Sequence, residues 1–334
     1  MIKLIKHELV SEFEIKAKNY WTGGTSRMEI YHNVHEIIGQ TPIMEITQFQ
    51  LPEKVRLFAK LEFMNPGGSV KDRLGIELLD AAFKSGELKP GGTVIEPTAG
   101  NTGIGLALAA INKQLKIILC VPEKFSLEKQ ALMRALGAEV VHTPTEEGMT
   151  GAIKKAKELV EQIPNSYCPQ QFANPSNPGT YYKTLAPEMW QQLDGEIDVF
   201  VAGAGSGGTF MGTSRYLKEK KPEMKTVIVE PEGSIIAGGE AGPHKTEGIG
   251  MEFLPEFMDR AYFDAIHTVS DDDAFRLVKE LASKEGLLVG SSSGAAFYAA
   301  LQEAKAAKPG TNIVVIFPDG SERYLSKNIF EGGI

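Results

Sequence analysis

The sequence predicts an α/β protein with two domains, each built on a mostly parallel twisted sheet that helices flank. From Val55 onward, short β-branched runs alternate with helical patterns at spacings of about 20 to 30 residues, as in βαβ units. The length of 334 residues is about twice that of a usual single domain. Hydrophobic residues make up 42% and charged residues 23%, which indicates an ordinary folded core rather than disorder.

The predicted strands are β-branched runs, and amphipathic helices connect them. One such helix covers 127–136, with Ser126 as its expected N-cap, and another covers 151–163 and ends before Pro164. The Pro- and Asn-rich segment 172–179 is the predicted junction between two sheets. The predicted strands cover residues 56–61, 93–96, 116–121, 139–142, 198–202, 226–230, 287–289 and 312–317.

The charge and the cysteine content exclude several classes of protein. Lys and Arg number 35 and Asp and Glu 43, so the net charge of −8 argues against a nucleic-acid partner. Two distant cysteines, Cys120 and Cys168, and the isolated pair His32 and His35 predict neither a disulfide framework nor a metal site. No apolar run is long enough for a membrane span or a signal peptide, so we expect a cytoplasmic protein.

Loops that follow the strands are expected to carry the chemistry, because ligands bind beyond the carboxyl ends of parallel strands. Thirty-five glycines, about one residue in ten, exceed the typical ~7%, and many of them fall in these loops. In the first loop, Lys71 lies in the first turn of a helix, where the helix dipole disfavours an ammonium. Lys71 is either a solvated surface residue beside Asp72 or a Schiff-base former and proton-transfer base.

The second loop, residues 96–105, links a strand to a helix that begins with small residues. Its N–H groups and the hydroxyls of Thr98 and Thr102 could converge on a carboxylate or another small anion. The alternative is a plain helix start at which Thr98 or Asn101 acts as the N-cap.

The third loop, residues 203–209, satisfies G-x-G-x-x-G at Gly203, Gly205 and Gly208 after an apolar strand. Glu230 lies at the end of the next strand, where a dinucleotide fold places its ribose-binding acid. An NAD(P)-dependent oxidoreductase is therefore one interpretation. The same backbone would bind any phosphate, so the motif indicates an anion site more firmly than it indicates a cofactor.

The fourth loop, residues 290–294, matches the G-x-S-x-G nucleophile elbow of α/β-hydrolases. That fold needs its catalytic histidine after the serine, whereas the last histidine of this chain is His267. Chain order therefore excludes the hydrolase interpretation. The serines remain free to bind a ligand or to cap the helix.

In combination, the four loops resemble the pyridoxal phosphate (PLP) site of the fold type II enzymes, the cysteine synthase and cystathionine β-synthase family. The similarity extends in order from residues 34–42 to residues 317–326, and it is greatest for the bacterial branch that uses O-acetylserine. The resemblance implies pyridoxal 5'-phosphate as cofactor, small-molecule amino-acid and thiol substrates, and a homodimer. Haem is not expected, and the charge and the lack of a long apolar run predict neither a nucleic-acid nor a membrane partner.

The resemblance also implies the roles of individual residues. Lys71 is expected to carry the cofactor covalently and, once released, to remove the substrate's α-proton. Ser292 is expected to face the pyridine nitrogen, where a neutral hydroxyl favours β-elimination. Asn101 is expected to bind the cofactor's 3'-oxygen. The implied phosphate ligands are Gly205, Ser206, Gly207, Gly208 and Thr209.

The substrate site implied by the resemblance departs from the family's usual pattern at Ala99, where most members have serine. Binding of the α-carboxylate is therefore expected to depend on threonine hydroxyls and backbone N–H groups. Gly250 is expected to line the opposite wall together with Gly248. The implied substrate-binding residues are Thr98, Ala99, Gly100, Thr102, Gln171 and Gly248.

Domain boundaries and the reaction follow from the same resemblance. Residues 28–42 and 65–175 are expected to form a smaller, mobile substrate-binding domain, and residues 43–64 and 176–334 a larger domain with the phosphate loop. Residues 1–27 form an N-terminal extension of unknown role. The predicted reaction is β-replacement on O-acetyl-L-serine or L-serine by homocysteine to give cystathionine. The alternatives are a cysteine synthase that uses sulfide and, from another class, the NAD(P) oxidoreductase.

Overall fold

A computed structural model describes residues 30–331, so the predicted extension at residues 1–27 lies outside the described part of the chain. The chain divides into two compact units, residues 1–36 and residues 37–334. All the described strands belong to the second unit, from β1 to β10. Among the described residues, no helix has both the length and the apolar composition that crossing a membrane requires.

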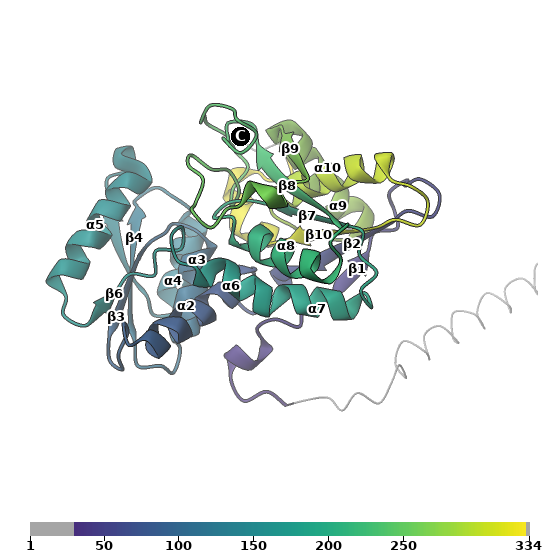
Figure 1. The fold of residues 1–334 in the computed structure, drawn as a ribbon. Coiled ribbons are helices and arrows are strands. Elements are labelled where there is room, and N and C mark those ends of the chain that lie inside the picture. Colours follow the sequence, from purple (N-terminus) through teal and green to yellow (C-terminus); the bar gives the residue numbers. More distant parts are fainter. Residues whose placement is uncertain (1–29, 332–334) are drawn as a thin grey trace, which may run out of the picture. The chain divides into compact units, whose positions relative to one another are not determined.

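Two sheets organise the second unit (Figure 1), which confirms the predicted fold class. Every neighbouring pair of strands is parallel except β1 and β2, which are antiparallel. The six-stranded sheet contains, in order, β1 (Ile43–Glu45), β2 (Arg56–Leu61), β10 (Asn312–Phe317), β7 (Val199–Gly203), β8 (Lys225–Pro231) and β9 (Ala265–Val269). The four-stranded sheet contains, in order, β5 (Glu139–Thr143), β4 (Lys116–Pro122), β3 (Thr93–Pro97) and β6 (Ser166–Tyr167).

Helices cover both faces of each sheet, as a parallel sheet requires. On the larger sheet, α10 (Ser291–Ala306) packs with α9 (Asp271–Glu285) on one face, and α8 (Gly208–Lys220) packs with α6 (Ser176–Lys183) and α7 (Leu185–Gln192) on the other. On the smaller sheet, α5 (Gly148–Gln162) covers one face, and α3 (Asn101–Ala110) and α4 (Leu127–Ala135) cover the other. Helix α2 (Lys71–Ser85) packs against α3 and α6.

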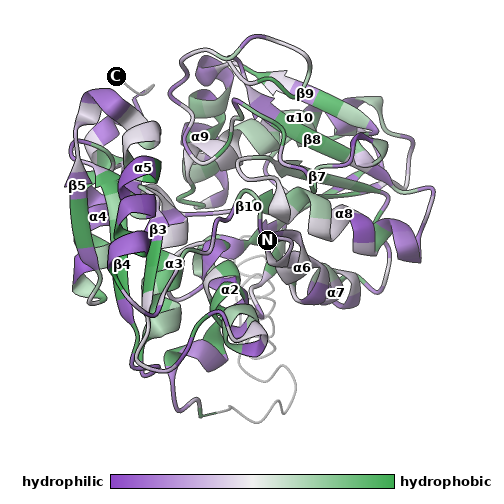
Figure 2. Ribbon diagram, turned by 60° about the vertical axis from the view of Figure 1, so that its left-hand side comes forward, coloured by the Kyte–Doolittle hydropathy of each residue, from purple (hydrophilic) through white to green (hydrophobic). Residues whose placement is uncertain are grey.

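Strand β10 shows how the sequence specifies this layering. Ile313, Val315 and Phe317 belong to the apolar core that includes α9 and α10, whereas Val314 and Ile316 belong to the core on the opposite face. All five side chains are buried. Since successive side chains of a strand point to opposite faces, an uninterrupted apolar run can only be satisfied by two covered faces. Figure 2 shows both sheets coloured mostly as hydrophobic in their interior strands.

The structure corrects three details of the sequence prediction. Residues 287–289 form no strand, and only Val289 makes an isolated bridge, to Gly320. Ser126 precedes α4, but its side chain caps no N–H group and its backbone is left-handed. Strands β1, β6 and β9 were not predicted. The other predicted strands are confirmed within two residues at each end, whereas the boundaries of the two predicted domains stay a prediction.

Candidate active site

The loops with unusual sequences meet where strand β10 ends. The carbonyl of Pro318 accepts a hydrogen bond from the N–H of Val70 at 2.8 Å, and the carbonyl of Asp319 accepts one from Gly290 at 2.9 Å. The carboxylate of Asp319 accepts a third from Nδ2 of Asn101, at 2.7 Å. Thus one short segment connects the loops that lead into α2, α3 and α10.

Lys71 is the first residue of α2, and its backbone N–H donates to Oγ of Ser69 at 3.2 Å. Its ammonium makes no hydrogen bond or ion pair with any described residue, and it lies 5.9 Å from the centre of the Tyr181 ring. The Lys71 side chain is only partly exposed. An ammonium without a partner, at a helix start and beside buried loops, fits a covalent attachment point better than a surface lysine.

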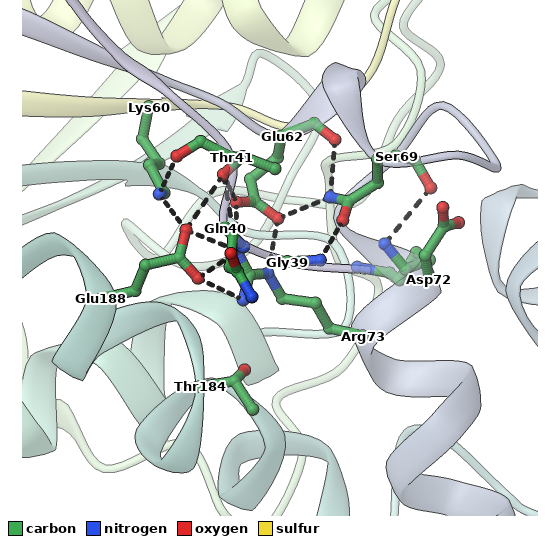
Figure 3. Close-up of polar contacts among 12 residues, drawn as sticks. Gly39, Gln40, Thr41, Lys60, Glu62, Ser69, Asp72, Arg73, Thr184 and Glu188 are labelled. Carbon is green, nitrogen blue, oxygen red and sulfur yellow. Dashed lines mark hydrogen bonds and ion pairs between the residues drawn. The ribbon is translucent and has the colours of Figure 1, made fainter. Parts of the chain in front are cut away.

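A buried cluster of ion pairs and hydrogen bonds around Arg73 holds the first turn of α2 in place (Figure 3). Arg73 donates from Nε and Nη2 to the two oxygens of Glu62, both at 2.8 Å, and from Nη1 to Glu188 at 3.0 Å. Lys60 also bonds Glu188, and Thr41 donates to Glu62 at 2.6 Å. Burial alone would raise the pKa of Glu62, but the charge and hydrogen bonds of Arg73 outweigh it and lower that pKa. The bidentate pair holds Arg73, and with it the start of the helix that carries Lys71.

The second loop brings most of the implied substrate residues together. Helix α3 begins at Asn101, and neither Thr98 nor Asn101 caps it through its side chain. The N–H of Gly100 donates to Oγ1 of Thr98 at 3.3 Å, and Ala99 lies between these two residues. The hydroxyl of Thr102 donates to Oε1 of Gln171 at 2.7 Å. Thr98, Thr102 and Gln171 are all buried, so a polar group bound here would be largely shielded from water.

The Gln171 segment reaches from this loop to the phosphate loop. Nδ2 of Asn177 donates to the carbonyl of Gln171 at 2.7 Å and to Oγ of Ser206 at 3.0 Å. The carboxylate of Glu96 accepts the N–H groups of Gln170 and Gln171, at 3.0 and 3.3 Å. These bonds place the implied carboxylate site next to the implied phosphate site.

The third loop has the geometry of an anion cradle. The N–H groups of Gly205, Ser206 and Gly207 donate to no described residue, and Gly208 and Thr209 begin α8, where N–H groups lack helical partners. Ser206 and Thr209 are buried, and Ser206 Oγ already accepts from Asn177, so its proton remains available. A β-carbon at Gly205 would collide with the carbonyl of Gly248. The residues present therefore fit the phosphate of the implied cofactor.

The fourth loop brings Ser292 into the same region. Ser292 is buried in the first turn of α10, and a β-carbon added to Gly248 would lie 3.9 Å from its Oγ. The neighbouring Ser291 accepts the N–H of Glu247 at 3.0 Å. Ser292 therefore lies in the same region as Gly248 and the phosphate loop. Gly250 follows Gly248 by two residues, and its N–H donates to the carbonyl of Ala204.

The carboxylate of Glu230 is already hydrogen-bonded inside the protein. It accepts the N–H groups of Ile236 and Ala237, at 2.8 and 3.0 Å, and the hydroxyl of Thr268 at 2.9 Å. Glu230 is completely buried. A ribose could not use an acid whose oxygens are already bonded inside the core, which argues against the dinucleotide interpretation.

Sequence reasoning missed two residues of this site, Asp319 and Arg323. Arg323 donates to Oδ1 of Asn101 at 2.7 Å and to the carbonyl of Gly67 at 2.9 Å. Asp319 and Arg323 are both buried. The rule that selected the other loops would have found Asp319, because it follows the carboxyl end of β10.

Two carboxyls near the site have strongly shifted pKa values. Burial raises the pKa of Asp72 to about 7, although it accepts the N–H of Gly67 at 2.5 Å. Burial likewise raises the pKa of Glu96 to about 7, although the hydrogen bonds from the N–H groups of Gln170 and Gln171 lower it. Folding therefore favours the protonated form of both groups at pH values where an unfolded chain has lost the proton.

The free energy of unfolding is expected to fall as the pH rises from about 5 to 7. The contribution of each raised carboxyl is fully present below its unfolded pKa of about 4 and is lost as the pH rises through its folded pKa of about 7, in total about 4 kcal/mol per group. Urea unfolding at pH 5, 6 and 7 measures the slope, and Glu96→Gln should flatten it. A free energy that rises across this window in the native protein would contradict the assignment.

Comparison with known proteins identifies relatives along almost the whole chain. A family model described as "Pyridoxal-phosphate dependent enzyme" matches residues 34–319. The O-acetylserine dependent cystathionine beta-synthase of Bacillus subtilis is 64% identical over 307 residues, which are 92% of this chain and all of that protein. A cysteine synthase of Helicobacter pylori is 56% identical over 305 residues, 91% of this chain and all of that protein. The crystal structure of an O-acetylserine dependent cystathionine beta-synthase from Helicobacter pylori, 56% identical, matches with a TM-score of 0.88 and covers 91% of this chain and all of that one.

Proposed function

Since the chain belongs to the family of pyridoxal-phosphate dependent enzymes, we propose that it replaces the acetoxy group of O-acetyl-L-serine by the sulfur of homocysteine, giving cystathionine and acetate. The similarity to the Bacillus subtilis O-acetylserine dependent cystathionine beta-synthase, along the whole of that protein, carries this proposal. The interpretation as an NAD(P) oxidoreductase is wrong, because the family to which the chain belongs depends on pyridoxal phosphate.

A cysteine synthase that uses sulfide is the second candidate. The two Helicobacter pylori relatives share the same 56% identity with this chain, yet one is named a cysteine synthase and the other an O-acetylserine dependent cystathionine beta-synthase. Both reactions begin with the same loss of acetate. They differ only in the sulfur nucleophile that adds, which is homocysteine in one case and sulfide in the other. The choice of acceptor depends on the shape of the pocket around the β-carbon.

Each residue of the site has its own role in the proposed reaction. When bound, the cofactor supplies an electron sink for the negative charge that develops at the substrate's α-carbon. Lys71 would hold the cofactor covalently, and its free Nζ would take the α-proton and later return it. Asn101 would orient the cofactor through its 3'-oxygen, and Ser292 through the ring nitrogen. The N–H groups of residues 205–209 would hold the phosphate.

The second loop would orient the substrate. Thr98, Thr102 and Gln171 would bind the α-carboxylate together with backbone N–H groups, since Ala99 offers no hydroxyl. The burial of these three polar side chains strengthens each hydrogen bond and limits the access of water to the reacting carbons. Gly248 would leave room for the substrate on the opposite side.

The purified enzyme should show a visible absorption band and should convert O-acetylserine and homocysteine to cystathionine. The measurement is kcat/KM for homocysteine and for sulfide with O-acetylserine as donor, repeated with serine as donor. We expect homocysteine to be preferred as acceptor and O-acetylserine as donor. A preference for sulfide by about 100-fold or more would transfer the assignment to cysteine synthase, and a colourless protein that binds NAD would contradict both.

Two further properties stay predictions. The homodimer is testable by light scattering, which should report twice the mass of the 36.3 kDa chain. The cytoplasmic location is testable by fractionation of cells that produce the protein.

A further inference from the structure

Lys129 of α4 is an unusual lysine, because its side chain is only 4% exposed. A buried ammonium is costly unless it has close partners. Nζ of Lys129 donates to Oε2 of Glu247 at 2.8 Å and lies 4.3 Å from the centre of the Tyr324 ring. The proposed binding and catalytic roles do not involve this lysine.

Its partner, Glu247, begins a segment that crosses the candidate active site. Gly248 follows it with φ at +86°, a conformation that favours glycine, and its carbonyl lies against Gly205 of the phosphate loop. The N–H of Glu247 donates to Ser291, next to Ser292. The position of Glu247 therefore decides where Gly248 lies relative to Ser292 and the phosphate loop.

The second partner of Lys129 is Tyr324, which connects it to the start of α3. The hydroxyl of Tyr324 donates to the carboxylate of Asp319, which in turn accepts from Asn101 at the start of α3. The buried ammonium of Lys129 thus contacts two segments. One contains Glu247, and the other contains Tyr324 and Asp319, the residue that accepts a hydrogen bond from Asn101. Helix α4 itself packs on the smaller sheet, whereas Glu247 and Tyr324 lie far from it in the sequence.

A second lysine bonds Glu247, but in a different environment. Lys327 contacts Oε1 of Glu247, and its side chain is 50% exposed. Exposed ion pairs are screened by water and salt and contribute little, whereas the loss of one partner of a buried pair leaves an uncompensated charge. Lys327 is therefore a matched control for Lys129, since both bond the same carboxylate.

We infer that Lys129 is a positioning residue for the substrate side of the site, because its ion pair with Glu247 holds residues 247–250 in place and keeps Gly248 beside Ser292. The inference rests on the proposed function, in which Gly248 lines the substrate site. It assigns to α4 a direct influence on substrate binding, although no residue of α4 is among the implied ligands.

The test compares Lys129→Met, Lys129→Arg and Lys327→Met. We expect Lys129→Met to raise KM for O-acetylserine by about fivefold or more while kcat changes by less than about threefold. In the cofactor-free protein, amide hydrogen exchange at residues 246–251 should become faster. Lys129→Arg should restore most of both values, and Lys327→Met should leave both near those of the native enzyme.

A lowered Tm of Lys129→Met with unchanged KM and unchanged exchange would show a merely structural role and overturn the inference. If Lys129→Met does not fold, Glu247→Gln removes the charge with little change of shape, and it should raise KM and speed exchange in the same way. Native values in Glu247→Gln would also overturn it. Because exchange is measured without substrate or cofactor, it gives an answer even if the donor proves to be another amino acid.

Discussion

Lys71→Ala is expected to abolish covalent attachment of the cofactor and to lower kcat by about 1,000-fold or more. The reason is that the proposed mechanism gives Lys71 both the covalent bond to the cofactor and the transfer of the α-proton. Lys71 Nζ has no hydrogen bond or ion pair with any residue in the described range, 30–331, so the substitution breaks no such contact. In the native enzyme, borohydride reduction should fix the cofactor to the peptide that contains Lys71, and mass spectrometry should detect the added mass. In the variant this labelled peptide should be absent, together with the visible band.

The matched control for this prediction is Lys84→Ala. Lys84 lies in the last turn of the same helix and is exposed, so its loss removes an equal charge without touching the site. Its spectrum, labelling and kcat should equal those of the native enzyme. A Lys71→Ala variant that keeps the visible band and turns over at a native rate would refute the assignment of Lys71.

The strands could be predicted from the sequence wherever both faces of a sheet are covered. Strands β7 and β10 lie in the interior of the larger sheet, and their uninterrupted apolar runs identify them. Strand β9 lies at the edge, and the polar residues His267 and Thr268 interrupt its run. Residues 287–289 show the opposite error. Leu287 and Val289 are buried in a core, but burial of a short apolar run does not require pairing in a sheet.

The candidate site could be predicted from the sequence where its residues are consecutive, as in the proposed phosphate loop, residues 205–209. It was not predictable where function depends on pairs of residues remote in sequence. Lys129 and Glu247 are separated by 118 positions, and Arg73 and Glu188 by 115. Each of these residues alone resembles a solvated surface charge, because only the tertiary structure removes them from water and brings them together. A single sequence contains no signal for such a pair.

Gly105→Ala is expected to destabilise the protein by about 3 kcal/mol, at the upper end of the usual cost of overpacking a core. Helices α2 and α3 pack through glycines, and a β-carbon at Gly105 would lie 2.3 Å from the carbonyl oxygen of Lys71. Facing it, a β-carbon at Gly75 would collide with the carbonyl of Gly105. Backbone atoms cannot rotate away as a side chain can, so the added methyl group must push the two helices apart.

The same substitution should disturb the site as well as the core, because the backbone that it displaces belongs to Lys71. We expect cofactor attachment in Gly105→Ala to fall together with stability, even at temperatures where the protein stays folded. Urea unfolding of the cofactor-free protein measures the first effect without a contribution from the cofactor, and the visible band after reconstitution measures the second.

Gly179→Ala separates this collision from any general effect of adding a methyl group to a helix. Gly179 lies inside α6, and a β-carbon there would have nothing within 4 Å. Alanine should therefore leave stability unchanged or raise it by up to about 1 kcal/mol, since glycine is the poorer helix former. If Gly105→Ala were as stable as Gly179→Ala, the close packing of α2 on α3 could not be what holds Lys71 in position. The ionic cluster around Arg73 would then have to fix the start of α2 alone.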